Sequence, residues 1–239
     1  MQVIKAKNTA KKTVKKLKKL NSLVVDYVSF YLVITCIIKA SSNDKTGDLI
    51  QTYLIDKKLM HEETVNFGSK CLECAMLSKC YVNKDKLSVR NALKRLESDS
   101  KTTSYELVSF DEALKHLKKA EKGLRLGTYG DPSILPLSDI EKLVNVSRMH
   151  TGYTHFWREI PTQYSRFLMA STECNADDLF SESLGYRAFR VLLKDKKEHT
   201  INDNFIECLN SSHDKTCLEC KLCNGNDKGS KKSIYNHEH

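Results

Sequence analysis

The hydrophobic positions of the chain fall into two patterns, continuous apolar runs and helical repeats. The longest run, Leu23–Ala40, is rich in Val, Ile, Tyr and Phe, which predicts one buried core strand. A polar turn at Ser41–Asp48 separates it from a second run, Leu49–Ile55, so the two runs predict a β-hairpin. Apolar positions at helical spacing predict helices over Lys86–Leu96 and Ser109–Gly123.

Strand and helix patterns alternate in the second half of the chain. Strands are expected at Leu124–Tyr129, Thr151–Trp157, Arg166–Thr172, Tyr186–Leu193 and Asn204–Cys208, and helices at Leu137–Met149 and Asn175–Gly185. This alternation predicts a parallel sheet covered by helices. With the earlier strands and Cys80–Val82 the total is about eight, so the expected α/β fold is a TIM-barrel-like closed or partial barrel with cysteine-rich metal-binding loops. An open doubly wound sheet is the alternative, although no GxGxxG or Walker loop favours nucleotide binding in it.

The 239 residues are enough for one large domain or two small ones. The pattern predicts four parts along the chain. They are a basic flexible tail over residues 1–22, an α/β domain over residues 23–209, a cysteine knuckle over residues 210–225 and a polar tail over residues 226–239.

The net charge of +9 originates mainly in the first twenty residues, which contain eight lysines and no acid. Without them, 31 of the 39 basic residues remain against 30 acidic ones, which is not the composition of a nucleic-acid-binding domain. The Lys-rich N-terminal tail alone could supply non-specific affinity for nucleic acid. A solvated, partly disordered arm is the alternative.

Basic residues followed by an apolar run also resemble a membrane anchor. However, Leu23–Ala40 is shorter than the roughly 20 residues that a spanning helix needs. Asp26 inside the run would cost such a helix about 3 kcal/mol. We therefore expect no membrane partner and a cytoplasmic protein whose cysteines stay reduced.

Nine cysteines are unusual for this length, and seven of them form two groups. The first group is Cys71, Cys74 and Cys80, and the second is Cys208, Cys217, Cys220 and Cys223. Thiolates are soft ligands, and four of them satisfy a tetrahedral zinc ion or an iron–sulfur cluster. The compressed spacing of the second group is closer to ferredoxin-type cluster binding than to a zinc ribbon. The sequence therefore predicts a metal centre of iron–sulfur or zinc type.

The first group supplies only three thiolates, and this leaves two interpretations. A cluster iron with an open position could bind substrate or S-adenosylmethionine. Alternatively, a fourth ligand comes from His61, Cys208 or another cysteine of the second group. Three plus four cysteines favour two sites, and one shared site is the alternative if the two ends of the chain meet.

Polar groups follow several of the predicted strands. Asp131 comes after the first strand of the alternating part, His155 lies in the next, and Ser171–Cys174 end the third. Because active sites of parallel α/β folds lie at the carboxyl ends of strands, Asp131 and His155 are the candidate catalytic residues. Taken singly, Asp131 before Pro132 is also a common turn former, and His155 is also compatible with a hydrogen-bonded core histidine.

Several motifs occur in an order that resembles an uncharacterised family of proteins encoded by bacteriophages and plasmids. They are KTGDLIQTYLI, CLECAMLSKCYVN, LRLGTYGDPSILP, TGYTHFW, FLMAST, GYRAFRVL and Cx8CLECKLCNG. The resemblance covers about Leu32–Gly225 and implies a mobile-element protein in the cytoplasm of a host cell, but it implies no reaction. Leu209–Ser211 replaces the Pro-Ala-Ser segment that is typical of the last motif in the family.

The chain is also similar, more faintly, to radical S-adenosylmethionine enzymes, which combine a partial barrel with three cluster cysteines. It departs from their Cys-x3-Cys-x2-Cys spacing, because two and then five residues separate Cys71, Cys74 and Cys80. We therefore expect a metal-binding protein of a mobile element whose enzymatic activity is open. A nucleic-acid accessory protein with structural metal sites is one alternative, and a partner-binding module with structural zinc is another.

Overall fold

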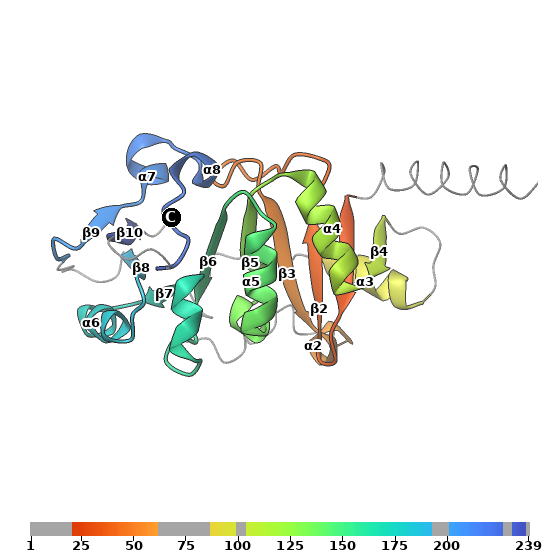
Figure 1. The fold of residues 1–239 in the computed structure, drawn as a ribbon, viewed down its shortest axis with the longest axis horizontal. Helices are drawn as coiled ribbons and strands as arrows, with labels where there is room; N and C mark the ends of the chain where they lie inside the picture. The colour runs from red at the N-terminus through yellow and green to blue at the C-terminus, as the bar shows by residue number, and fades with distance from the viewer. Residues whose placement is uncertain (1–20, 62–86, 99–103, 193–200, 227–230, 238–239) are drawn as a thin grey trace, which may run out of the picture.

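The computed structural model describes residues 21–61, 87–98, 104–192, 201–226 and 231–237. Within these ranges the strands form one mixed sheet in the order β4-β1-β2-β3-β5-β6-β7-β8-β10-β9 (Figure 1). Only the β1–β2 and β2–β3 pairs are antiparallel among the described strands, and the other neighbours are parallel. Since β4 and β9 end the row, the sheet is open, and the closed barrel expected from the sequence is wrong for these strands.

The described elements are short. The strands are β1 (Ser22–Asp26), β2 (Phe30–Thr35), β3 (Ile50–Asp56), β4 (Tyr105–Val108), β5 (Leu124–Tyr129), β6 (His150–Thr154), β7 (Met169–Thr172), β8 (Ala188–Leu192), β9 (Phe205–Glu207) and β10 (Ser233–His237). The helices are α2 (Lys57–His61), α3 (Leu87–Glu97), α4 (Phe110–Ala120), α5 (Leu137–Asn145), α6 (Asn175–Ser183), α7 (Leu209–His213) and α8 (Cys217–Cys220), with 3-10 turns η3 (Pro132–Ile134) and η4 (Thr162–Arg166).

The long apolar run forms two strands and not the single strand that the sequence predicted. β1 and β2 are antiparallel neighbours, and a tight turn between them places the Tyr27 amide 3.0 Å from the Phe30 carbonyl. Val28 at the tip of the turn is almost fully exposed. The turn contains no Gly, Pro or Asn, so the sequence carried no turn signal there. The predicted hairpin with the next strand is confirmed by the antiparallel β2–β3 pair.

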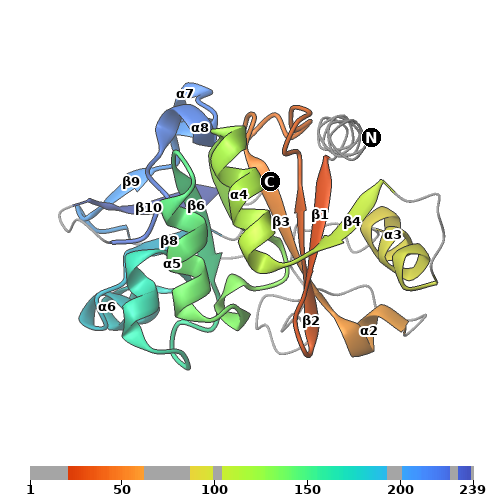
Figure 2. The ribbon, with the colours of Figure 1, turned by 45° about the vertical axis from the view of Figure 1, so that its right-hand side comes forward.

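Successive residues of the first strands contribute to two cores on opposite faces of the sheet. Leu23 and Val25 pack into the core beneath α4 and α5, whereas Val24 packs into the core that α3 covers (Figure 2). Because side chains alternate across a strand, a strand covered on both faces is apolar throughout. This explains why the run shows no alternating polar positions.

The predicted parallel alternation from Leu124 onwards is confirmed for β5, β6, β7 and β8, which are neighbours in chain order. The helix caps differ in detail. Of Asp111 and Ser109, the two residues that the sequence offers as caps for α4, Ser109 is the cap and accepts a hydrogen bond from the Glu112 amide. The N-cap of α6 is Cys174, one residue before Asn175 at the predicted start, and its side chain makes no capping bond.

The chain end contains a strand that sequence patterning did not predict. Residues Ser233–His237, placed by the sequence in a polar tail, form β10 between β8 and β9 and are parallel to both. This segment has only Ile234 and Tyr235 as large hydrophobic residues, so its polar composition concealed it. β9 is therefore separated from β8 by a strand that comes last in the chain.

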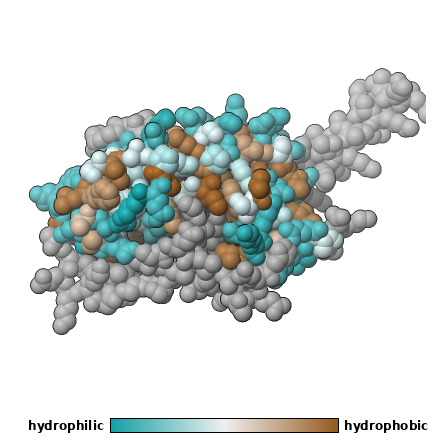
Figure 3. Space-filling view, turned by 90° about the horizontal axis from the view of Figure 1, so that it is seen from below, coloured by the Kyte–Doolittle hydropathy of each residue, from teal (hydrophilic) through white to brown (hydrophobic). Residues whose placement is uncertain are grey.

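The helices that follow β3 and β9 lie at different ends of the molecule, although both strands belong to the parallel part of the sheet. α2 follows the carboxyl end of β3, whereas α7 and α8 lie at the opposite end of the molecule (Figures 1 and 2). Figure 3 views the molecule from below Figure 1. On the described part of this lower face, hydrophobic and hydrophilic residues are interspersed. No helix within the described ranges has the length and apolar character needed to cross a membrane.

Candidate metal centre and strand-end site

The second cysteine group lies at the end of the molecule that carries α7 and α8. Cys208 follows β9, and its amide donates a 2.8 Å hydrogen bond to the Tyr235 carbonyl of β10. Cys217 and Cys220 are the first and last residues of α8. Cys223 follows, and its carbonyl accepts a 3.1 Å hydrogen bond from the Gly152 amide of β6. Backbone contacts to two different strands thus fix both ends of the group.

α8 is short, but it has strong local support. Thr216 is its N-cap and forms a capping box with Glu219, in which each side chain bonds the backbone of the other residue. The amides of Cys217 and Leu218 donate to the carbonyls of Lys45 and Thr46 at 3.0 and 3.2 Å. The loop before β3 therefore anchors the start of α8.

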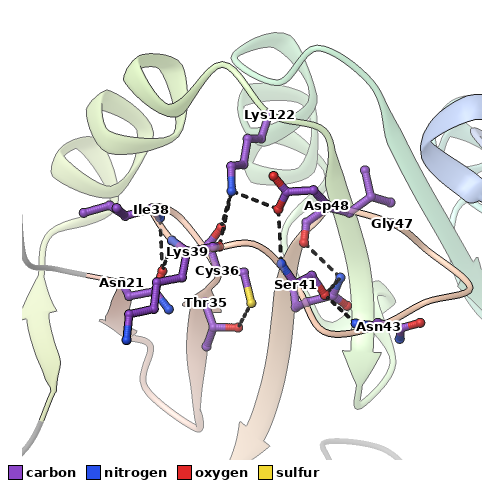
Figure 4. A network of polar contacts seen from close by, with 12 residues as sticks. Asn21, Thr35, Cys36, Ile38, Lys39, Ser41, Asn43, Gly47, Asp48 and Lys122 are labelled. Carbon is purple, nitrogen blue, oxygen red and sulfur yellow. Dashed lines mark hydrogen bonds and ion pairs between the residues drawn. The ribbon is translucent and has the colours of Figure 1, made fainter.

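That loop is itself fixed by a network around Lys122 (Figure 4). The ammonium group of Lys122 lies 2.9 Å from Asp48 Oδ1 and 3.3 Å from the carbonyls of Cys36 and Lys39. Asp48 Oδ1 also accepts a 3.1 Å hydrogen bond from the Ser41 amide. A cation that bonds three acceptors at once holds the segment after β2 against the loop that supports α8.

The four thiols of the group are free and lie near one another. Burial, together with the charges of Cys217, Cys208 and Cys220, raises the pKa of Cys223 to about 12. Burial also raises the pKa of Cys217 and of Cys220, with Cys208 adding to both shifts and Cys220 to the first. Every pair among the four thiols therefore interacts electrostatically. Four thiolates so placed repel one another, and a bound cation would relieve that repulsion.

The backbone at α8 also favours thiolate at Cys220. Lys221 follows it in the left-handed region with φ 58°, and its amide bonds the Cys217 carbonyl at 2.9 Å. This turn directs the Leu222 amide at Cys220, a contact that lowers the pKa of the thiol and opposes the effect of burial. Amides that donate to a sulfur stabilise its anionic form.

Three side chains outside the cysteine group act on it. A hydrogen bond from Tyr153 of β6 lowers the pKa of Cys223, and the positive charge of Arg125 of β5 lowers the pKa of Cys217, although burial outweighs both effects. Arg187, just before β8, is 3% exposed. Burial lowers its pKa, and the charge of Cys223 acts in the opposite direction. Sequence reasoning missed all three. An arginine among apolar strand residues, as in GYRAFRVL, was the available signal.

The donor set suits a soft metal in chemistry and in number. Among the described residues, however, no three His, Cys, Asp or Glu side chains already stand in the geometry of a metal-binding group. Binding therefore requires the four thiols to turn toward a common centre.

At the carboxyl ends of β5 and β6, Asp131 and His155 lie together as the sequence predicted. Asp131 is buried, and its two carboxylate oxygens accept the amides of Ser133 and His155 at 2.9 and 2.8 Å. Burial lowers the pKa of His155, while the charges of Asp131 and Glu173 act in the opposite direction. Three neighbouring strand ends thus bring one imidazole and two carboxylates together. Asp131 also forms a turn, since it caps η3. This is the role that the sequence offered for it as the alternative to catalysis.

A buried ion pair lies beside this end of the sheet on α6 and β8. Arg190 Nη1 lies 3.0 Å from Asp178 Oδ2, and both side chains are at most 5% exposed. Burial raises the pKa of Asp178, while Thr172 and Arg190 oppose the shift. The pair connects β8 to α6, the helix that begins directly after Glu173 and Cys174. It supports the strand-end site without belonging to it.

Several predicted features lie outside the described residues. They are Cys71, Cys74, Cys80, the strand at Cys80–Val82 and the Lys-rich tail over residues 1–20. The open iron position, S-adenosylmethionine binding and nucleic-acid contact through the tail consequently stay predictions. No family model, curated protein or solved structure matches the chain.

Proposed function

We propose that the chain is a metal-binding protein in which Cys208, Cys217, Cys220 and Cys223 bind a zinc ion or an iron–sulfur cluster. The observation that carries the proposal is that Cys208 and Cys223 pack against the same small apolar cluster, with Cys217 and Cys220 at the two ends of α8 just before Cys223. Cys217, Cys220 and Cys223 are close in sequence, whereas Cys208 follows β9 and is brought to them by the fold. When bound, the metal supplies a positive centre that holds α8, β6 and β9 together at one end of the sheet.

The experiment must separate this centre from the first cysteine group. We would replace Cys71, Cys74 and Cys80 by serine and purify that variant without oxygen. Iron, zinc and acid-labile sulfide are then measured together with the visible spectrum. We expect one centre per chain, brown with a broad band near roughly 400 nm if it is iron–sulfur and colourless if it is zinc.

Adding Cys220→Ser to this variant should abolish the centre. Adding Cys36→Ser is the matched control, because Cys36 is also a free, half-buried cysteine but follows β2. Equal metal content in the Cys220→Ser protein and in its parent would contradict the proposal.

A second candidate function rests on the strand-end site. We propose that His155 transfers a proton there and that Asp131 positions it through its backbone amide. The supporting observation is a half-buried histidine whose backbone amide bonds the Asp131 carboxylate at a neighbouring strand end, with the charge of Glu173 also acting on the imidazole. The test is the proton affinity of His155 described below, since a general base working near neutral pH must be unprotonated there.

A further inference from the structure

Arg187 connects two backbone segments that meet next to the cysteine group. Its Nη1 donates to the carbonyls of Leu222 and Gly225 at 2.8 and 2.9 Å. Its Nε lies 3.1 Å from the carbonyls of Lys231 and Lys232, and Nη2 also contacts Lys232. One guanidinium thus bonds four carbonyls, two in the segment that carries Cys223 and two just before β10.

The position of Arg187 shows which face it serves. Side chains alternate along β8, so Arg187 and Phe189 face the side on which Cys223 packs, and Arg190 faces α6. A charged guanidinium with a 3% exposed side chain is costly to bury unless its donors are satisfied, and carbonyl oxygens satisfy them here. The chain therefore retains a buried charge next to a cysteine and uses it to fix backbone.

The charge of Arg187 also complements the proposed centre. Four thiolates with one divalent ion, or with a cluster core of the same charge, carry a net charge of about −2. Arg187 near Cys223, Arg125 near Cys217 and Lys215 near Cys220 are positive groups whose charges act on it. Tyr153 bonds the Cys223 thiol from β6.

We propose that Arg187 is the positioning residue of this metal centre, and that metal binding and the docking of β10 are linked through it. The inference rests on the proposed function above. Arg187 fixes Cys223 relative to β10, and Cys208 is bonded to β10 through the Tyr235 carbonyl. β10, while it stays between β8 and β9, therefore helps to hold two of the four ligands in place. Binding of a metal to all four thiols in turn holds β10 in the sheet.

The test is a Co(II) titration of the protein that lacks Cys71, Cys74 and Cys80, with the thiolate charge-transfer band as the readout. Arg187→Lys keeps the charge but loses the forked donors, and we expect its Co(II) affinity to fall at least tenfold, with a weaker band. Arg190→Lys is the matched control, because it makes the same change on the other face of β8, and it should bind Co(II) like the parent.

Unchanged affinity in Arg187→Lys would overturn the inference and leave the proposed function intact. If the parent protein binds no Co(II), the proposed function fails, and the inference fails with it. If Arg187→Lys does not fold, amide hydrogen exchange of the parent protein with and without Zn(II) tests the linkage instead. Zn(II) should slow exchange of the Gly152 and Cys208 amides at least tenfold and leave the Leu124 amide, bonded to the Met149 carbonyl, unchanged. Equal effects on all three amides, or no effect, would contradict the linkage.

Discussion

The amide of Gly152 in β6 donates a 3.1 Å hydrogen bond to the carbonyl of Cys223. This contact ties the last cysteine of the second group to the centre of the sheet. Gly152 is needed there, because a Cβ would lie 2.7 Å from Leu168 Cδ2 and 3.1 Å from Leu126 Cβ. The cysteine segment is therefore part of the packed fold and not a loose appendage.

Gly225→Ala should destabilise the protein and weaken metal binding at the proposed centre. Gly225 has φ +69°, and a Cβ would lie 2.5 Å from the Arg166 carbonyl oxygen, so the backbone must move. Gly185→Ala is the control, since φ is +82° but the nearest atom, Ser165 Oγ, is 3.8 Å away. We expect the control to lose about 1 kcal/mol of unfolding free energy and Gly225→Ala about twice that or more. Equal losses in urea denaturation would show that Gly225 is not tightly packed.

The stability of the protein should depend on pH through His155. Burial lowers its pKa from the usual 6.5, so between pH 6.5 and the folded-state pKa the unfolded chain binds more protons than the folded protein. The free energy of unfolding therefore falls as pH falls through this window. His155→Asn should remove that part of the dependence when unfolding is compared at about pH 7.5 and about pH 5.5. A folded-state pKa above 6.5 in an NMR titration would refute both this prediction and a neutral His155 base.

Cys174→Ser should stabilise the protein. Cys174 is the N-cap of α6 with an extended backbone, and its thiol makes no capping bond. A serine hydroxyl accepts the first helical amides, which contributes about 1 kcal/mol at such positions. Denaturant unfolding measures the gain, with Cys36→Ser as a control away from any helix start. A loss of stability would mean that the thiol packs better than the hydroxyl bonds.

In the metal-free protein, the Cys223 thiol should react slowly with an alkylating reagent. Cys223 is 7% exposed and its pKa is raised to about 12, so little of it is thiolate near neutral pH. Since the thiolate is the nucleophile, iodoacetamide should modify Cys223 far more slowly in the folded protein than in urea. Mass spectrometry of timed samples gives the rates. A Cys223 that reacts equally fast in both states would contradict its burial.

Parts of the fold with a strong periodic pattern could be predicted from the sequence. The hairpin of β2 and β3, the helices α3, α4 and α6, and the parallel order of β5 to β8 all carry apolar spacing that local sequence determines. β10 could not be predicted, because its partners β8 and β9 come earlier in the chain and its own residues are largely polar. The turn at Val28 could not be predicted either. Strands that are covered on both faces are apolar throughout, so the sequence does not show where one ends and the next begins.

The candidate sites were predictable in part. The cysteine spacing marked Cys208, Cys217, Cys220 and Cys223, and the strand ends marked Asp131 and His155. The supporting residues Tyr153 and Arg125 could not be identified. Their relevance depends on which strands lie next to the cysteine segment, and that arrangement is set by tertiary contacts.

The most direct test of the central claim is X-ray absorption at the edge of the bound metal, on the protein whose Cys71, Cys74 and Cys80 are serine. For zinc we expect four sulfur ligands at about 2.3 Å and no nitrogen or oxygen ligand. For iron we expect the same sulfur shell together with an iron–iron distance that indicates a cluster. Fewer than four sulfur neighbours, or no bound metal after anaerobic purification, would contradict a centre built from Cys208, Cys217, Cys220 and Cys223.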